Sequence, residues 1–246
     1  MTGSGTSSRS SRPPTEPDSP AGPVEVPSHA ALAELLERHA DFAPAPLAPE
    51  VRVFRARGLV EIWEAAERLA SRTVPPPFWA YPWPGGMALA RIVLDHPEWV
   101  EGRRVLDLGA GGGVAALAAA RAGAREVVAN DQDPWALATA RLAADRQGLP
   151  LTPLLADLTA EPAAIDDFDV VLCGDLAYER RVAPRIRQLL VRARNTGARV
   201  LIADAGRAYF DETGLVRLAE FTVAVPKDLE GVRERVARVF AMQGEG

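Results

Sequence analysis

Residues 104–113 read Arg104-Val-Leu-Asp-Leu-Gly-Ala-Gly-Gly-Gly113, and this stretch decides the fold. Its first half is a short apolar run typical of a buried strand, and an alanine-rich segment predicted to be a helix (Gly113–Ala122) follows directly. Glycines let the backbone turn tightly and let a ligand approach the main chain without a Cβ in the way. Many nucleotide-binding proteins share such a turn, so by itself it indicates only a nucleotide-like ligand.

Short apolar strands alternate with helices on the carboxyl side of this turn. Strands are predicted at Glu126–Asn130, Leu151–Ala156, Asp169–Cys173, Arg199–Asp204, Glu220–Val225 and Arg233–Phe240, and helices at Pro134–Gln147 and Val182–Arg194. This alternation predicts an α/β fold with a mostly parallel, Rossmann-like sheet flanked by helices on both faces. In such sheets the ligand lies beyond the carboxyl ends of the strands, so the site is expected there.

Two acidic residues narrow the choice of ligand. Asp107 lies inside the turn, where its charge would repel a pyrophosphate, and Asp131 follows the second strand, where a carboxylate can accept both hydroxyls of a ribose. S-adenosylmethionine carries positive groups and no phosphate, so we predict that it is the cofactor bound by this turn. A structural turn with a capping aspartate and a dinucleotide-dependent oxidoreductase are the alternatives.

Two further aspartates follow strands of the same half. Asp157, after the third strand, can bond the adenine amino group, but aspartate also favours turns and helix caps, so a turn or cap role is the alternative. Asp133, directly before Pro134, is predicted to be the N-cap of the second helix.

Asp175 and Tyr178 follow the fourth strand and are the candidates for catalysis. An acid beside the methyl group can orient an incoming amine and stabilise the cation that forms as the amine is alkylated. The alternative is that Asp175 caps the next helix and Tyr178 packs on it. Cys173 is predicted to be a buried strand residue rather than a nucleophile.

The densest aromatic cluster, which we call the aromatic lid, reads Pro77-Phe-Trp-Ala-Tyr-Pro-Trp-Pro-Gly-Gly86. We expect it to cover cofactor and substrate, with Trp79 and Trp83 as apolar or cation–π walls for a sulfonium or an ammonium group. The alternative is a hydrophobic clasp that anchors the N-terminal helices.

Length and composition predict three segments. The 246 residues suit one large α/β domain. Residues 1–27, rich in Gly, Ser, Thr and Pro, are predicted to be a disordered tail. Residues 28–99 are predicted to form an N-terminal helical extension with the aromatic lid, starting at an N-cap, Ser28, and residues 100–246 to form the S-adenosylmethionine-binding domain.

Charge and cysteine content exclude several classes of protein. The net charge of −5 provides no basic surface for nucleic acid, and a single cysteine forms neither a disulfide framework nor a cysteine zinc cluster. No apolar run approaches the roughly 20 residues of a membrane span, and the N-terminus lacks the apolar region of a signal peptide. We therefore expect a cytoplasmic monomer that binds neither nucleic acid nor membrane.

Four motifs, taken in order, resemble a known family. They are Pro77-Phe-Trp-Ala with Trp83-Pro-Gly-Gly, Val105-Leu-Asp-Leu-Gly-Ala-Gly, Ala129-Asn-Asp-Gln-Asp-Pro134 and Gly174-Asp-Leu-Ala-Tyr178. From about Pro49 to Arg238 the chain is similar to the lysine methyltransferase of the electron-transfer flavoprotein β-subunit, one of the class I, seven-β-strand methyltransferases with an Asp-x-x-Tyr motif.

This resemblance implies a seven-stranded sheet, S-adenosylmethionine as cofactor, and methylation of lysine on a protein such as the electron-transfer flavoprotein β-subunit. Catalysis is assigned to Asp175 with Tyr178. The expected cofactor-binding residues are Trp83, Asp107, Gly109, Gly111, Asp131, Gln132, Asp157 and Asp175. The family's aromatic residue before the motif tyrosine is replaced by Ala177, which would widen the acceptor pocket, and the retained Asp204, Gly206 and Arg207 place their loop beside that pocket.

Three other functions compete with this interpretation. One is N-methylation of a small, nicotinamide-like amine, which Ala177 would favour, and another is lysine methylation of a ribosomal protein. The third is a cofactor-binding protein without catalysis, against which the presence of both Asp175 and Tyr178 argues.

Overall fold

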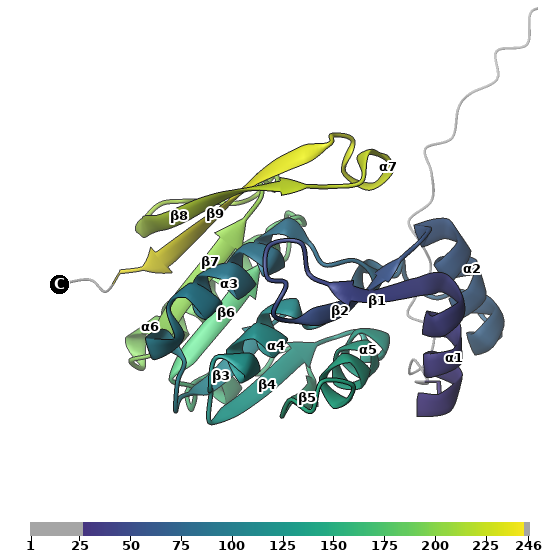
Figure 1. Cartoon of the computed structure of the whole chain (residues 1–246). Helices are drawn as coiled ribbons and strands as arrows, with labels where there is room; N and C mark the ends of the chain where they lie inside the picture. The colour runs from purple at the N-terminus through teal and green to yellow at the C-terminus, as the bar shows by residue number, and fades with distance from the viewer. Residues whose placement is uncertain (1–26, 244–246) are drawn as a thin grey trace, which may run out of the picture.

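The computed structural model describes residues 27–243, so the predicted tail lies, except for Pro27, outside the described residues (Figure 1). The helices and strands are, in chain order, α1 (His29–His39), β1 (Ala40–Pro44), β2 (Arg52–Ala56), α2 (Leu59–Ala70), α3 (Pro84–Asp95), β3 (Arg104–Leu108), α4 (Val114–Arg121), β4 (Glu126–Asp131), α5 (Pro134–Asp145), β5 (Thr152–Leu155), β6 (Val170–Gly174), α6 (Ala183–Asn195), β7 (Arg199–Asp204), β8 (Leu215–Ala224), α7 (Lys227–Glu230) and β9 (Glu234–Met242).

Seven strands form the central sheet, in the order β5-β4-β3-β6-β7-β9-β8. The first five are parallel, and β9 runs antiparallel to both β7 and β8. The predicted mostly parallel, seven-stranded sheet is therefore confirmed. The chain moves outward in opposite directions from β3, through β4 on one side and β6 on the other, so the crevice for a ligand lies beyond the carboxyl ends of β3 and β6.

The two faces of the sheet are covered differently (Figure 1). One face carries α3, α4 and α5, and every residue of α4 from Val114 to Ala120 is buried, which explains its alanine-rich sequence. The other face carries α6 and a short 3-10 turn. No helix separates β7 from β8, so part of that face is covered only by the connecting loop, residues 205–214.

The N-terminal extension contains a hairpin in addition to its two helices. The sequence predicted a helical extension, whereas β1 and β2 pair antiparallel within it, with Phe42 opposite Phe54. The hairpin forms because α1 ends at His39 and its C-cap Ala40 is already extended, and the N–H of Ala45 donates a hydrogen bond to the carbonyl of Val51 that closes the turn. Helix α3 packs on β6, β7 and β9 of the sheet, although the predicted division placed its residues in the extension.

Both predicted helix caps are confirmed. Ser28 Oγ accepts a hydrogen bond from the backbone N–H of Ala31 at 3.2 Å, and Asp133 Oδ1 accepts one from Trp135 at 2.9 Å.

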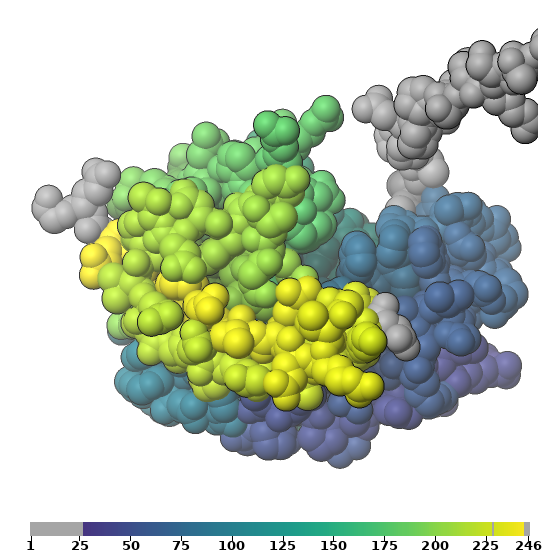
Figure 2. All heavy atoms as spheres, turned by 90° about the horizontal axis from the view of Figure 1, so that it is seen from above, coloured from purple at the N-terminus to yellow at the C-terminus, as the bar shows by residue number. Residues whose placement is uncertain are grey.

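Seen from above, the C-terminal hairpin β8–β9 lies on the surface beside the N-terminal extension (Figure 2). Between residues 27 and 243, no helix has the length and apolar character needed to span a bilayer.

Candidate active site

The glycine turn lies at the carboxyl end of β3 and has a backbone that only glycine adopts readily. Gly109 and Gly111 have φ values of +68° and +52°. A Cβ on Gly109 would also lie 2.5 Å from a methyl carbon of Leu176, so the turn packs directly against the chain that leaves β6. The turn therefore joins the ends of the two central strands.

Asp131 holds this turn from the end of β4. Its Oδ2 accepts a hydrogen bond from the N–H of Gly111 at 2.9 Å, and its Oδ1 accepts one from Asp133 at 3.0 Å. Burial raises the pKa of Asp131, and these backbone donors oppose the rise. The structure thus brings together two predicted cofactor residues that are 20 positions apart, while the neighbouring Gln132 is exposed.

Asp107 is buried beneath the turn. Its Oδ2 accepts a hydrogen bond from the N–H of Ala116 in the first turn of α4, at 2.9 Å, which is the capping role considered from the sequence. Burial is the largest influence on its pKa and, with the charge of Asp131, raises it to about 7. Asp107 also lines the groove above the turn, so capping and a ligand contact are compatible.

Asp157 occupies a different environment. Its side chain is exposed, and Oδ1 accepts hydrogen bonds from both the N–H and the hydroxyl of Thr159, at 2.9 and 2.6 Å. These bonds lower its pKa. This geometry is that of the turn role, and Asp157 does not line the groove.

A groove runs over the glycine turn between the aromatic lid and the sheet. It is lined by Val53, Phe54, Tyr81, Pro82, Trp83, Gly86, Asp107, Gly109, Ala110, Gly111, Gly112, Val114, Ala115 and Gly174. No lysine or arginine stands among these residues, so the groove offers aromatic faces and a carboxylate rather than counter-charges for phosphate. That chemistry fits a sulfonium cofactor and disfavours a dinucleotide.

The two tryptophans of the lid have different roles. Trp83 is half-buried in the groove wall, and its Nε1 donates a hydrogen bond to the carbonyl of Phe78 at 2.8 Å. Trp79 is only 3% exposed and stacks on Trp135 of α5 with the ring centroids 6.0 Å apart. Trp79 therefore packs the lid against α5 rather than against the N-terminal helices that the clasp interpretation named, whereas Trp83 lines the groove.

Asp175, at the exit of β6, is buried and contacts three segments of the chain. Its Oδ2 accepts a hydrogen bond from the N–H of Gly85 at 2.5 Å, and its Oδ1 accepts hydrogen bonds from Arg207 Nε at 3.0 Å and the N–H of Ala205 at 3.3 Å. Burial raises the pKa of Asp175, and the charge of Arg207 opposes the rise. Asp175 does not cap α6, which begins at Ala183, so that alternative is wrong.

Tyr178 lies at the rim of the same site. Its side chain is 50% exposed and meets Phe78 of the lid edge-on, with the ring centroids 6.3 Å apart. Partial burial, together with the charge of Glu179, raises the pKa of Tyr178. The two half-exposed rings therefore lie together at the surface, and Tyr178 follows Asp175 by three residues along the chain.

Two residues near Asp175 were given no role by the sequence analysis: Gly85, which contacts Asp175, and Glu230, which contacts its partner Arg207. Gly85 approaches Asp175 so closely that a Cβ would lie 2.7 Å from the carboxylate. Glu230 of α7 pairs with Arg207 at 3.0 Å. The glycine could have been suspected from the Gly85-Gly86 pair, but nothing in the polar sequence around Glu230 indicates a place near the site.

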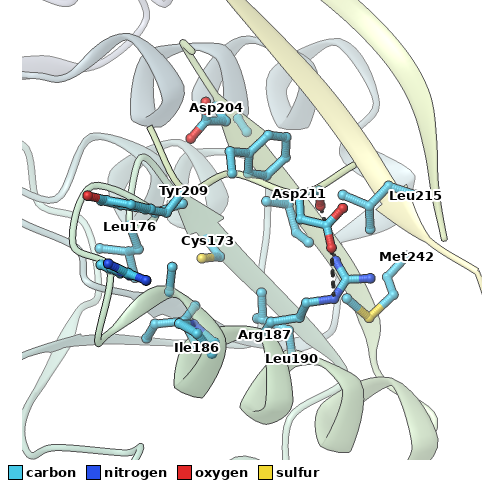
Figure 3. A pocket seen from close by; sticks show the side chains of 17 residues that line it. Cys173, Leu176, Ile186, Arg187, Leu190, Asp204, Tyr209, Asp211, Leu215 and Met242 are labelled. Carbon is cyan, nitrogen blue, oxygen red and sulfur yellow. Dashed lines mark hydrogen bonds and ion pairs between the residues drawn. The ribbon is translucent and has the colours of Figure 1, made fainter. Parts of the chain in front are cut away.

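A larger cavity, of about 430 Å³, lies on the other face of the sheet, between α6 and the β7–β8 connection (Figure 3). Its walls are mostly apolar and include Cys173, Leu190 and Met242. Cys173 is buried, as predicted, and burial raises the pKa of its thiol. Ala177 lines this cavity rather than the groove, so the space beside Ala177 opens away from the glycine turn. Among the described residues, no group of three His, Cys, Asp or Glu side chains could hold a metal ion.

Known proteins resemble this chain in the region that builds the site. A model of the methyltransferase domain family matches residues 105–197. The electron transfer flavoprotein beta subunit lysine methyltransferase of Danio rerio is 43% identical over 152 residues, covering 60% of this chain and 58% of that protein. The protein of the same name from Xenopus laevis is 35% identical over 193 residues, covering 76% of this chain and 77% of that protein.

A relative with another name is the ribosomal protein L11 methyltransferase of Dechloromonas aromatica, which is 32% identical over 191 residues, covering 75% of this chain and 59% of that protein. The match to the Xenopus protein extends over most of both chains, and the methyltransferase domain model spans the glycine turn, Asp131 and Asp175. The chain belongs to the family of the electron transfer flavoprotein β-subunit lysine methyltransferases.

Proposed function

We propose that this chain transfers a methyl group from S-adenosylmethionine to the side-chain amine of a lysine in a protein. The observation that carries the proposal is the position of Asp175: a buried carboxylate at the exit of β6, next in the chain to Gly174 of the groove and bonded to Gly85, the neighbour of the groove residue Gly86. Tyr178, three residues further along the chain, forms a rim with Phe78. A methyl donor in the groove and an amine entering at the rim would meet at this carboxylate.

The groove, together with Asp131, which holds its glycine turn, fits the cofactor that the family uses. Asp131 would accept hydrogen bonds from the ribose, the glycine turn would let the cofactor lie against the backbone, and Trp83 would cover the sulfonium. Gln132 and Asp157 are exposed and do not line this groove, so they would contact the adenine end only where the cofactor extends beyond it. When bound, the cofactor supplies a methyl group that an amine takes up as a C–N bond forms and a C–S bond breaks.

The chain itself must hold the amine, neutral and dry, in line with the methyl group. A carboxylate has about four lone-pair sites, and Asp175 uses three of them on Gly85, Ala205 and Arg207, which leaves one for an N–H of the amine. A lysine side chain held against the half-exposed rings of Phe78 and Tyr178 would displace water from them, and loss of water lowers the pKa of a lysine amine toward the neutral form that reacts.

The acceptor we propose is the electron transfer flavoprotein β-subunit, because the relatives from Danio rerio and Xenopus laevis are named as lysine methyltransferases of that protein. The ribosomal protein L11 is the second candidate, since the methyltransferase named for it is also a relative. A small heteroaromatic amine is the third, and it would need none of the surface around the rim.

The test is incubation of the purified chain with methyl-labelled S-adenosylmethionine and each candidate acceptor. Label in the flavoprotein subunit supports the proposal, label only in L11 or in the small-molecule fraction replaces the acceptor, and no label in any fraction refutes methyl transfer. The Asp175→Asn variant is the inactive control. Because Lys227 is the only lysine in the sequence, a Lys227→Arg variant removes self-labelling of side chains as a source of signal.

A further inference from the structure

Glu230 is a buried carboxylate in the connection between β8 and β9. Its side chain is only 2% exposed, although glutamate is seldom buried without charged partners. It has two such partners: Arg235, whose Nε donates a hydrogen bond at 2.9 Å, and Arg207, whose Nη2 donates one at 3.0 Å. Glu230 is therefore built into the protein interior at the tip of a hairpin, where side chains are usually exposed.

Arg207 joins Glu230 to the candidate catalytic acid. Its Nε donates to Asp175 Oδ1 at 3.0 Å, while Nη1 and Nη2 donate to the two oxygens of Glu230 at 3.3 and 3.0 Å. The guanidinium also lies over the ring of Trp83, 5.2 Å from its centroid. The rigid fork of donors is thus divided between two buried carboxylates, and an aromatic ring covers its face.

The position of Arg207 affects the pKa of Asp175. Among the described residues, Arg207 is the cation that contacts Asp175, and it opposes the rise in pKa that burial causes. The other ionisable groups near Asp175 do not help: Asp204 has the same charge, and burial keeps the thiol of Cys173 protonated. If Arg207 moved away, Asp175 would lose its only opposing charge and one of its hydrogen bonds.

We propose that Glu230 is a positioning residue for methyl transfer, acting through Arg207 to hold Asp175 in its place and in its charged form. The proposal rests on the proposed function, because it is methyl transfer that gives Asp175 its role. Arginine has a long, flexible side chain, and without the Glu230 carboxylate its guanidinium has one buried anchor instead of two. The tip of the β8–β9 hairpin thereby controls the carboxylate of Asp175, directly after β6, through the guanidinium of Arg207.

The test compares Glu230→Gln and Glu230→Asp with a matched control, Glu220→Gln. Glu220 is on the same hairpin and accepts a hydrogen bond from Arg238 at 2.9 Å, but its side chain is 48% exposed and it does not contact the site. We expect Glu230→Gln to lower kcat about tenfold, Glu230→Asp to recover part of that loss, and Glu220→Gln to match the unmodified chain. The Kd for S-adenosylmethionine, measured by calorimetry, should stay unchanged in all three.

The pH dependence of kcat supplies a readout that a purely structural ion pair would not move. With Arg207 released, the pKa of Asp175 rises, so the ionised carboxylate is lost at a higher pH than before. The acid limb of the profile should therefore move to higher pH in Glu230→Gln and not in Glu220→Gln. An unchanged kcat together with an unchanged acid limb overturns the proposal.

A second measurement separates failure of this proposal from failure of the proposed function. If the unmodified chain methylates no acceptor, the link between Glu230 and Asp175 is still visible in a carbon-13 NMR titration of the aspartate carboxyl groups, with Asp175→Asn assigning the resonance. A higher pKa for Asp175 in Glu230→Gln supports the link. The same pKa in both proteins refutes it, whatever the enzyme does.

Discussion

The carboxyl edge of the sheet has two halves that hold their carboxylates in different ways. On the side of β3 and β4, Asp107 and Asp131 accept hydrogen bonds only from backbone N–H groups of the glycine turn and the helices that follow. On the side of β6 and β7, Asp175 is held by an arginine as well as by backbone donors, and that arginine is held by Glu230 on a distant hairpin.

This difference shows what each half can do. Backbone donors are fixed by the fold, so the carboxylates of the first half need no charged side chain from another segment to hold them. The second half depends on side chains from three separate segments, so it is complete only when the C-terminal hairpin is packed in place. We therefore expect substitutions in the first half to change cofactor affinity and those in the second to change turnover.

The largest effect is expected for Asp175→Asn. Loss of the charge at the reacting amine should reduce kcat about 10³-fold, while the Kd for S-adenosylmethionine stays within about threefold of the original value. Steady-state kinetics and calorimetry measure the two quantities. The exposed Asp167→Asn, 85% exposed in its side chain, is the control. If Asp175→Asn lost both cofactor affinity and turnover, the assignment of affinity to one half and turnover to the other would be wrong.

Asp131→Ala should have the opposite signature. Removing the acceptor of the Gly111 N–H and the proposed ribose ligand should weaken cofactor binding about 10- to 100-fold, and kcat at saturating cofactor should change little. The neighbouring Asp133→Ala is the control, since it should cost about 1 kcal/mol of stability through the lost N-cap and leave the affinity intact. Equal loss of affinity in both variants would contradict the assignment to Asp131.

Smaller changes in kcat and Kd are expected for Gly85→Ala and Gly86→Ala, which add a methyl group next to the second and the first half. In Gly85→Ala the new Cβ would lie 2.7 Å from Asp175 Oδ2 and 2.8 Å from the carbonyl oxygen of Ala203, so the carboxylate must shift and kcat should fall about tenfold. In Gly86→Ala the Cβ would meet only a side-chain methyl of Val114, at 3.0 Å, on the wall of the groove. That variant should raise the Kd for the cofactor more than it lowers kcat, and the reverse result would break the comparison.

The smallest effect concerns the pH dependence of stability in the first half. Burial raises the pKa of Asp107 to about 7, above the 3.8 of an unperturbed aspartate, so the folded state binds a proton that the unfolded state has lost. The stability from this group is present below about pH 4 and is lost as the pH rises toward 7. Asp107→Asn removes this dependence and keeps an oxygen for the N–H of Ala116.

Thermal unfolding of the cofactor-free protein from pH 5 to pH 8 measures this difference. The Tm of the unmodified chain should fall relative to that of Asp107→Asn across this range, by about 2–4 °C for each kcal/mol lost. The other groups, including Asp133 with its pKa raised to about 6 by burial, are common to both proteins. If the two proteins gave parallel curves of Tm against pH, Asp107 would be charged in the folded state from pH 5 to pH 8, and burial would not raise its pKa as expected.

Much of the fold was predictable because its elements are encoded locally. The strand at Arg199–Asp204 has the predicted bounds, and α5 begins at Pro134 as its N-cap aspartate indicated. The first terminal strand was less well predicted, since β8 begins at Leu215, five residues before the predicted Glu220. Its exposed, alternating residues give a weak apolar pattern, because only one face of this edge strand packs on the protein.

The site was predictable to the extent that its residues follow strands. Asp107, Asp131 and Asp175 lie where the carboxyl ends of parallel strands meet, which the order of strands and helices along the chain implies. The sequence could not tell which lid tryptophan packs in the core and which lines the groove. Trp79 and Trp83 lie in the same stretch of prolines and aromatic residues, and they differ only in what packs against each ring.

The sequence by itself determined the alternation of strands and helices, the glycine turn and the acids that follow the strands, since each depends on residues within one turn or one strand of each other. Only the tertiary structure decided what holds Asp175. Along the chain, Asp175 is 90 positions from Gly85, 32 from Arg207 and 55 from Glu230. A network of charged side chains of this kind does not follow a periodic sequence pattern. Its members are brought together by sheet pairing and burial, which fix the partners of a charged side chain only once the whole sheet has formed.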